Sequence, residues 1–178
     1  MPEHMLENGL VQVYTGNGKG KTSASFGLAL RAVGRGLKVY IIQFIKGGFD
    51  YGELHVVDKL PGLTLEAFGR GKFVSEKKPD MVDIDLARQA LAKAREIMKG
   101  GGVDVLILDE INVAVSLKLI GIEEVLELIK KKPEHMELVL TGRKAPVEIV
   151  QAADLVTEMV EIKHPYNSGF KARKGIEY

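Results

Sequence analysis

The sequence lacks cysteine entirely, and it has no long apolar run. Without cysteine there are no disulfide bonds, thiolate nucleophiles or cysteine-ligated metal sites. No apolar run approaches the ~20 residues that a membrane-spanning helix requires. No secretory signal precedes the first apolar segment. We therefore expect a cytoplasmic protein with no membrane partner.

An excess of charge of one sign is also missing. Lysine and arginine number 25 against 24 aspartate and glutamate residues, which gives a formal net charge of +1. This balance gives no support to a large electrostatic surface for nucleic acid, so we expect no nucleic-acid partner. With 178 residues, 46% of them apolar, the chain is long enough for a substantial core. We expect one domain spanning residues 1–178.

The most informative stretch is Thr15-Gly16-Asn17-Gly18-Lys19-Gly20-Lys21-Thr22. It follows an apolar run at 10–14 and precedes a helical pattern at 20–35, which is the context of a phosphate-binding loop. Glycines let several backbone N–H groups point at one anion, and the start of a helix adds its positive dipole end. Lys21 can reach phosphate oxygens, and the Thr22 hydroxyl can ligate Mg²⁺.

The motif departs from the strict phosphate-loop pattern in its first element. That pattern has glycine where this chain has Thr15. A plain glycine-rich turn with two solvated lysines is therefore an alternative. A dinucleotide-binding fingerprint is disfavoured, because it would need glycine at Lys21 and an acidic residue after the second strand, which ends near Gln43.

Strand and helix patterns alternate along the chain. Strands are expected at 10–14, 38–45, 63–68, 103–108, 136–140 and 155–162, and helices at 20–35, 53–60, 81–99, 111–119, 122–131 and 146–153. This order predicts an α/β fold of three layers, a mostly parallel sheet with helices on both faces. Ligands bind beyond the carboxyl ends of such strands, so residues 16–22, 43–48, 109–110 and 141–143 should share one rim.

Charged residues on that rim suggest further contacts. Asp109 and Glu110 follow the apolar run 105–108, where an acid can hold Mg²⁺ opposite the hydroxyl of a phosphate loop. The alternative is an acidic cap on the next helix. Arg31 could reach the ribose or a partner, or be a surface arginine. Arg143 could neutralise a phosphate or carboxylate, or form a salt bridge at a helix cap.

The phosphate loop resembles that of the ATP:corrinoid adenosyltransferases of the P-loop NTPase, RecA-like type. The resemblance runs in order from Leu10 to Tyr178, nearly the whole chain. The other matching segments are 31–34, 43–47, 108–110, 140–143, 153–154, 163–169, 171–172 and 175–178.

The resemblance implies a reaction. A reduced corrinoid, cob(I)alamin or a precursor such as cob(I)yrinic acid a,c-diamide, attacks the 5′ carbon of ATP, and inorganic triphosphate leaves. Cobalt is the nucleophile, so no side-chain nucleophile or base is demanded. Catalysis then consists of positioning and of stabilising the charge of the leaving triphosphate.

The resemblance also implies roles for named residues. Lys21, Thr22 and Glu110 are the candidate catalytic residues, and Thr22 and Glu110, with Asp109 beside them, would hold Mg²⁺. Asn17 and Arg31 would touch the nucleoside. The nucleotide-binding set is Gly16, Asn17, Gly18, Lys19, Gly20, Lys21, Thr22 and Arg31.

Partners follow from the same resemblance, which implies a homodimer and an electron donor such as a reduced flavoprotein. Loops after Gln43 and around 69–74 would face the corrinoid. Members often have Gly-Phe-Thr-Trp there, whose aromatic rings help displace the lower ligand of cobalt, where this chain reads Gly71-Lys72-Phe73-Val74. Some members cover the site with an N-terminal helix. Only about nine residues precede the first strand here, so we expect that cover to be absent or supplied from elsewhere.

Two other functions fit the phosphate loop alone. One is a P-loop ATPase or kinase in which Glu110 positions a water or a hydroxyl group. The other is a non-catalytic nucleotide-binding module. The product separates the three functions: triphosphate for the adenosyltransferase, ADP and phosphate for the ATPase or kinase, and neither for the binding module.

Overall fold

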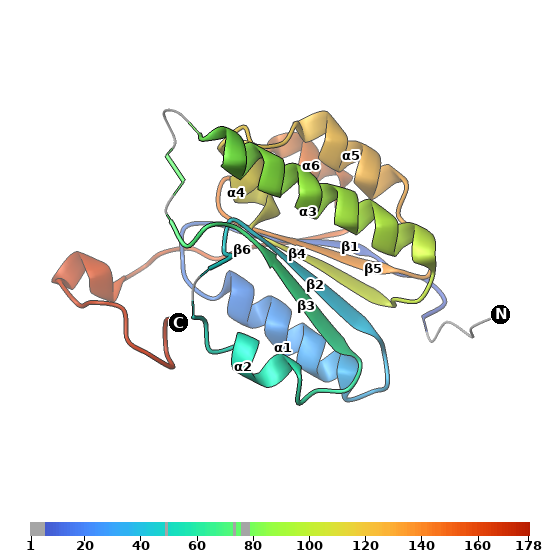
Figure 1. Ribbon diagram of the computed structural model, residues 1–178, viewed down its shortest axis with the longest axis horizontal. Coiled ribbons are helices and arrows are strands. Elements are labelled where there is room, and N and C mark those ends of the chain that lie inside the picture. The colour runs from blue at the N-terminus through green and yellow to red at the C-terminus, as the bar shows by residue number, and fades with distance from the viewer. Residues whose placement is uncertain (1–5, 49, 73, 76–78) are drawn as a thin grey trace.

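The computed structural model describes residues 6–48, 50–72, 74–75 and 79–178. In these ranges the strands form one sheet, in the order β3-β2-β4-β5-β1-β6 (Figure 1). All neighbouring strands in it run parallel. The strands are β1 (Val11–Thr15), β2 (Val39–Phe44), β3 (Leu63–Phe68), β4 (Val105–Asp109), β5 (Glu137–Thr141) and β6 (Leu155–Glu158).

Helices cover both faces of this sheet. They are α1 (Lys21–Val33), α2 (Leu54–Val57), α3 (Met81–Gly100), α4 (Ile111–Ser116), α5 (Ile122–Lys130) and α6 (Val147–Ala152). In Figure 1, α1 and α2 lie below the sheet, and α3 to α6 lie above it. The predicted three-layer α/β arrangement is therefore confirmed. No helix of the described part of the chain is both long enough and apolar enough to cross a membrane.

The core is divided by the sheet, as strand β4 shows. Leu106 and Leu108 belong to the apolar cluster that includes residues of α3 and α5. Val105 and Ile107 belong to the other cluster, which includes Ala29 of α1. Alternate side chains of a strand point to opposite faces, and here both faces are apolar. This explains why the strand reads as a continuous hydrophobic run.

The last strand is shorter than the sequence predicts. We expected it to continue to 162, but β6 ends at Glu158, and all four of its residues are exposed. Beyond that point the backbone bonds to the phosphate loop, because Met159 N donates to Thr15 O at 2.9 Å and Met159 O accepts from Gly18 N at 2.7 Å. The segment that follows the edge strand therefore supports a loop and does not extend the sheet.

Two other features differ from the expected elements. The helix predicted over 111–119 ends at Ser116, and Lys118 has a left-handed backbone with φ 58°. The polar tail contains a 3₁₀ helix over Pro165–Ser168, which the sequence patterns did not reveal. Phe73, named above for the corrinoid-facing loop, lies outside the described residues.

Candidate active site

The phosphate loop needs glycine at several positions for different reasons. Gly20 precedes α1 with φ 112°, and Gly16 has φ 92°, a conformation that L side chains rarely adopt. At Gly18 a Cβ atom would lie 2.7 Å from the backbone oxygen of Met159. The spacing of glycines in the motif therefore reflects both the turn into the helix and the close packing of the segment after β6.

Thr15, the departure from the strict motif, has a structural role of its own. Its Oγ1 accepts a hydrogen bond from Ala145 N at 3.2 Å, just before α6. A glycine here would lack that hydroxyl group. The threonine thus ties the start of the loop to the connection between β5 and α6.

Lys21 is buried within the loop that it follows. Only 8% of it is exposed, and its Nζ donates to Gly16 O at 2.8 Å and Gly18 O at 2.6 Å. Burial lowers the pKa of Lys21, while the charge of Glu110 opposes that shift. The alternative of a turn with two solvated lysines is therefore wrong for Lys21, although Lys19 is exposed.

Thr22 and Asp109 face each other across the rim, from α1 and β4. Thr22 Oγ1 donates to Asp109 Oδ1 at 3.0 Å, and Thr141 Oγ1 donates to the same oxygen at 2.7 Å. Asp109 is completely buried. These short bonds join the phosphate loop to the ends of β4 and β5. Within the described residues, no group of three or more histidine or acidic side chains is placed to hold a metal ion.

Glu110 occupies the turn between β4 and α4. Its backbone is left-handed, with φ 63°, and its N–H donates to Thr141 Oγ1 at 3.0 Å. Burial and the charge of Asp109 raise the pKa of the Glu110 carboxyl group, against the opposing charge of Lys46. Glu110 stands at the N-cap position of α4, but its side chain makes no capping hydrogen bond there, and Asp109 lies within β4.

Gln43 of β2 and Lys46, just beyond the end of that strand, complete this cluster, and the sequence patterns gave neither a role at the phosphate loop. Lys46 Nζ lies 2.7 Å from Asp109 Oδ2 and donates to Thr22 Oγ1 at 2.9 Å. Gln43 Nε2 donates to Asp109 Oδ2 at 3.3 Å. Burial lowers the pKa of Lys46, yet the charge of Asp109 and its hydrogen bond outweigh burial and leave the pKa raised. The expectation that ligand-binding residues gather at the carboxyl ends of the strands grouped residues 43–48 with the phosphate loop. It could not show that Lys46 contacts Thr22 and Asp109.

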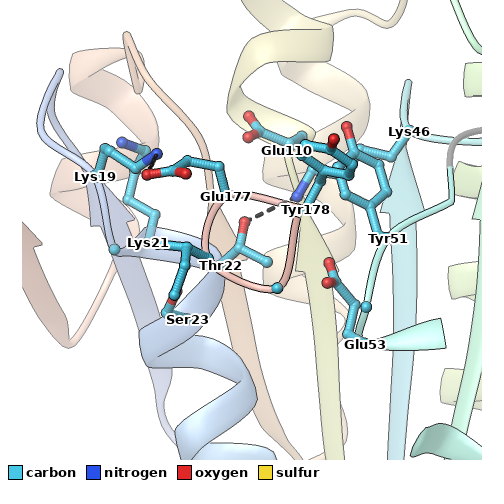
Figure 2. A pocket seen from close by; sticks show the side chains of 14 residues that line it. Lys19, Lys21, Thr22, Ser23, Lys46, Tyr51, Glu53, Glu110, Glu177 and Tyr178 are labelled. Carbon is cyan, nitrogen blue, oxygen red and sulfur yellow. Dashed lines mark hydrogen bonds and ion pairs between the residues drawn. The ribbon is translucent and has the colours of Figure 1, made fainter. Parts of the chain in front are cut away.

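A cavity of about 430 Å³ opens above these residues. Figure 2 shows the phosphate-loop side chains on one side of it and those after β2 on the other. The lining residues are Lys19, Gly20, Lys21, Thr22, Ser23, Lys46, Tyr51, Gly52, Glu53, Glu110, Gly175, Ile176, Glu177 and Tyr178.

The C-terminal tail forms one wall of this cavity. Glu177 lies 3.6 Å from Lys19 Nζ and accepts a bond from Arg173 Nη2 at 3.1 Å. These interactions, above all the hydrogen bonds from Arg173, lower the pKa of Glu177 to about 2. The resemblance of residues 175–178 to the family indicated that this segment matters. It did not show that the segment folds back to the cavity.

The remaining predicted residues lie apart from the cavity. Arg31 is exposed in the last turn of α1 and is not among the described residues that line the cavity. Asn17 is exposed at the tip of the phosphate loop. Arg143 is exposed beyond β5, and its positive charge contributes to lowering the pKa of Lys21 and opposes the rise at Glu110.

Comparison with known proteins identifies the chain's relatives. Residues 7–178 match the family model described as ATP:corrinoid adenosyltransferase BtuR/CobO/CobP. A corrinoid adenosyltransferase from Sinorhizobium sp. is 39% identical over 97% of this chain and 81% of its own length. The corrinoid adenosyltransferase of Escherichia coli K12 is 35% identical over 97% of this chain and 87% of its own. The chain therefore belongs to the ATP:corrinoid adenosyltransferase family, whose members transfer the adenosyl group of ATP to the cobalt of a corrinoid.

Proposed function

We propose that the corrinoid is cob(I)alamin or a precursor such as cob(I)yrinic acid a,c-diamide. Co(I) gives its electron pair to C5′ of ATP, and the bond between C5′ and its oxygen breaks. Triphosphate leaves with that bonding pair, and cobalt becomes Co(III). The observation that carries the proposal is the phosphate loop at the start of α1, with Thr22 bonded to Asp109 across the rim.

The loop from Gly16 to Thr22 would bind the triphosphate. Backbone N–H groups of a glycine-rich turn at a helix start favour an anion. Lys21 would exchange the carbonyl groups of Gly16 and Gly18 for phosphate oxygens. It would thereby stabilise the charge that develops on the leaving group.

Mg²⁺ would be held by Thr22 and Glu110, with Asp109 beside them. The donors fit such an ion, because they are hard oxygen groups, and two of them, Thr22 and Asp109, already hold the ammonium group of Lys46. Mg²⁺ commonly takes one or two carboxylates together with substrate phosphates. When bound, the ion would neutralise the triphosphate charge.

Asn17 and Arg31 would contact the nucleoside, and the loops after Gln43 and around 69–74 would face the corrinoid. The close contact of these two loops supports this part of the proposal, because Gly71 N donates to Gly47 O. We further propose a homodimer and an electron donor such as a reduced flavoprotein. The cytoplasmic location stays a prediction.

The test is incubation with ATP, Mg²⁺ and chemically reduced cobalamin. The absorption spectrum is recorded before and after illumination, and the phosphate products are separated. We expect a light-sensitive adenosylated corrinoid and one triphosphate for each molecule formed. Release of ADP alone would contradict the proposal and favour the ATPase or kinase alternative. If neither triphosphate nor ADP is released, the result would favour a non-catalytic nucleotide-binding module.

A further inference from the structure

Lys46 lies where a metal ion would meet the phosphate loop. Its Nζ is 2.9 Å from Thr22 Oγ1 and 2.7 Å from Asp109 Oδ2. These two oxygen atoms belong to the side chains proposed to bind or flank Mg²⁺. The Lys46 ammonium group, from the loop after β2, therefore already occupies a cation site formed by residues of α1 and β4.

This contact satisfies a buried charge. Asp109 is completely buried, and the Lys46 side chain is 14% exposed. The neutral donors Thr141 and Gln43 also reach the carboxylate, at 2.7 and 3.3 Å. Neutral donors alone leave the negative charge of a buried carboxylate uncompensated, and removing the partner of such a charge is strongly destabilising. Lys46 supplies the compensating charge.

Lys46 and a divalent ion cannot share this position. Two positive charges about 4 Å apart repel by roughly 1–4 kcal/mol per pair of unit charges, depending on the local dielectric. Mg²⁺ would also have to approach the Thr22 Oγ1 atom, which already accepts the Lys46 bond at 2.9 Å. Entry of the metal therefore requires the ammonium group to move away.

The cavity offers the ammonium group a second place. Lys46 lines the cavity from the side opposite the phosphate loop, and Lys19 and Lys21 line it from the side of that loop (Figure 2). Its Nζ lies 5.5 Å from the centre of the Tyr51 ring, which can hold a cation at its face. A flexible four-carbon stem allows the group to turn from the floor of the cavity toward a ligand within it.

We infer that Lys46 is a displaceable cation. When no metal is bound, the Lys46 ammonium group neutralises Asp109. When Mg²⁺ binds, the ammonium group leaves Thr22 and Asp109 and binds an oxygen of the triphosphate. This inference rests on the proposed binding of Mg²⁺ and triphosphate. It adds a lysine from the loop after β2 to the residues that position the leaving group.

The test measures binding of Mn²⁺, a paramagnetic substitute for Mg²⁺, by electron paramagnetic resonance without nucleotide or corrinoid. In Lys46→Gln the competing charge is gone, so Mn²⁺ should bind about tenfold more tightly than to the original protein. Lys19→Gln is the matched control. It removes a charge from the same cavity without touching Asp109, and should change Mn²⁺ affinity by less than about twofold. Equal or weaker Mn²⁺ binding in Lys46→Gln would overturn the inference.

A second variant covers the case in which Lys46→Gln does not fold. In Lys46→Arg the guanidinium group can grip the carboxylate through two bonds, so Mn²⁺ should bind several-fold more weakly. Unchanged binding would overturn the inference.

The triphosphate contact is measured separately, by titrating inorganic triphosphate with Mg²⁺ present. Lys46→Gln should bind it about tenfold more weakly, because a charge-assisted bond is lost. Unchanged triphosphate affinity would refute the second half of the inference. If the original protein makes adenosylated corrinoid but the Lys46 variants bind Mn²⁺ with unchanged affinity, the proposed role of Lys46 is wrong and the proposed function stands.

Discussion

The phosphate-binding side and the C-terminal tail line the same cavity, but they are held in place differently. On the phosphate side, Lys21 is buried and donates to carbonyl groups of the phosphate loop, and the buried Asp109 accepts hydrogen bonds from Thr22 of α1 and Thr141 of β5. The tail is exposed, and bonds within it fold its last residues, as between Arg173 and Glu177. Ile176, at the cavity wall, is 67% exposed.

This difference separates two kinds of contribution. Side chains on the phosphate side are part of the hydrogen-bond network of the fold, so changing them should weaken binding and lower the free energy of unfolding, although the protein should still fold. Most tail residues that line the cavity are exposed to solvent, so changing them should alter ligand binding with little effect on the stability of the fold. The predictions below test this division.

The largest effect is expected for Lys21→Ala. Loss of the ammonium group removes a contact to the leaving triphosphate, so adenosyl transfer should fall at least about 100-fold. The far-ultraviolet circular dichroism spectrum should stay unchanged. Lys19→Ala, an exposed lysine of the same loop, should lose much less. Unfolding of Lys21→Ala would show that the lysine is needed mainly to hold the loop carbonyl groups.

Glu110→Ala is expected to raise the Mg²⁺ requirement. The concentration for half-maximal rate should rise about tenfold, because one carboxylate ligand is lost. Glu53→Ala is a matched control, since Glu53 lines the same cavity but bonds to Gln43 at 3.4 Å. An unaltered Mg²⁺ titration in Glu110→Ala would remove this residue from the proposed ligands.

A smaller effect is expected in the tail, from Glu177→Gln. The carboxylate lies 3.6 Å from Lys19, so removing its charge should free that lysine and lower the KM for ATP by about twofold. The effect should shrink at high salt. Glu161→Gln changes an exposed carboxylate of the tail that lies away from Lys19 in the sequence, and it should have no effect. A raised KM for ATP would indicate that Glu177 helps to hold the nucleotide.

The smallest expected effect concerns stability against pH. The raised pKa of Glu110 means that the folded state binds its proton more tightly than the unfolded state. This contribution is complete below the ordinary pKa of glutamate and is lost as pH rises through the raised value. Urea unfolding at several pH values should show that the original protein loses stability relative to Glu110→Gln across that window. An original protein that gains stability relative to Glu110→Gln as pH rises would contradict the burial of this charge.

Much of the fold could be predicted because local patterns determine it. The strand at 63–68 has the predicted bounds, and the helix after the phosphate loop begins one residue from its expected start. The rule that ligand-binding residues gather at the carboxyl ends of parallel strands placed Thr22 and Asp109 on one rim, where they are hydrogen-bonded to each other.

Other features depend on contacts between distant segments. The end of β6 is set by Met159, which bonds to the phosphate loop. The place of Lys46 depends on the path of the loop after β2, where Ile45 has φ 58°. The return of Glu177 to the cavity depends on the course of the whole tail. No periodicity or spacing in the sequence encodes these contacts.

The central claim is that the phosphate loop grips the triphosphate while C5′ is attacked by cobalt. The most direct test uses ATP labelled with ¹⁸O at the oxygen that bridges C5′ and the first phosphorus, with mass spectrometry of the products. The account predicts that the label leaves in inorganic triphosphate and that the corrinoid gains an adenosyl group without it. Recovery of the label in ADP, with no adenosylated corrinoid, would contradict the account.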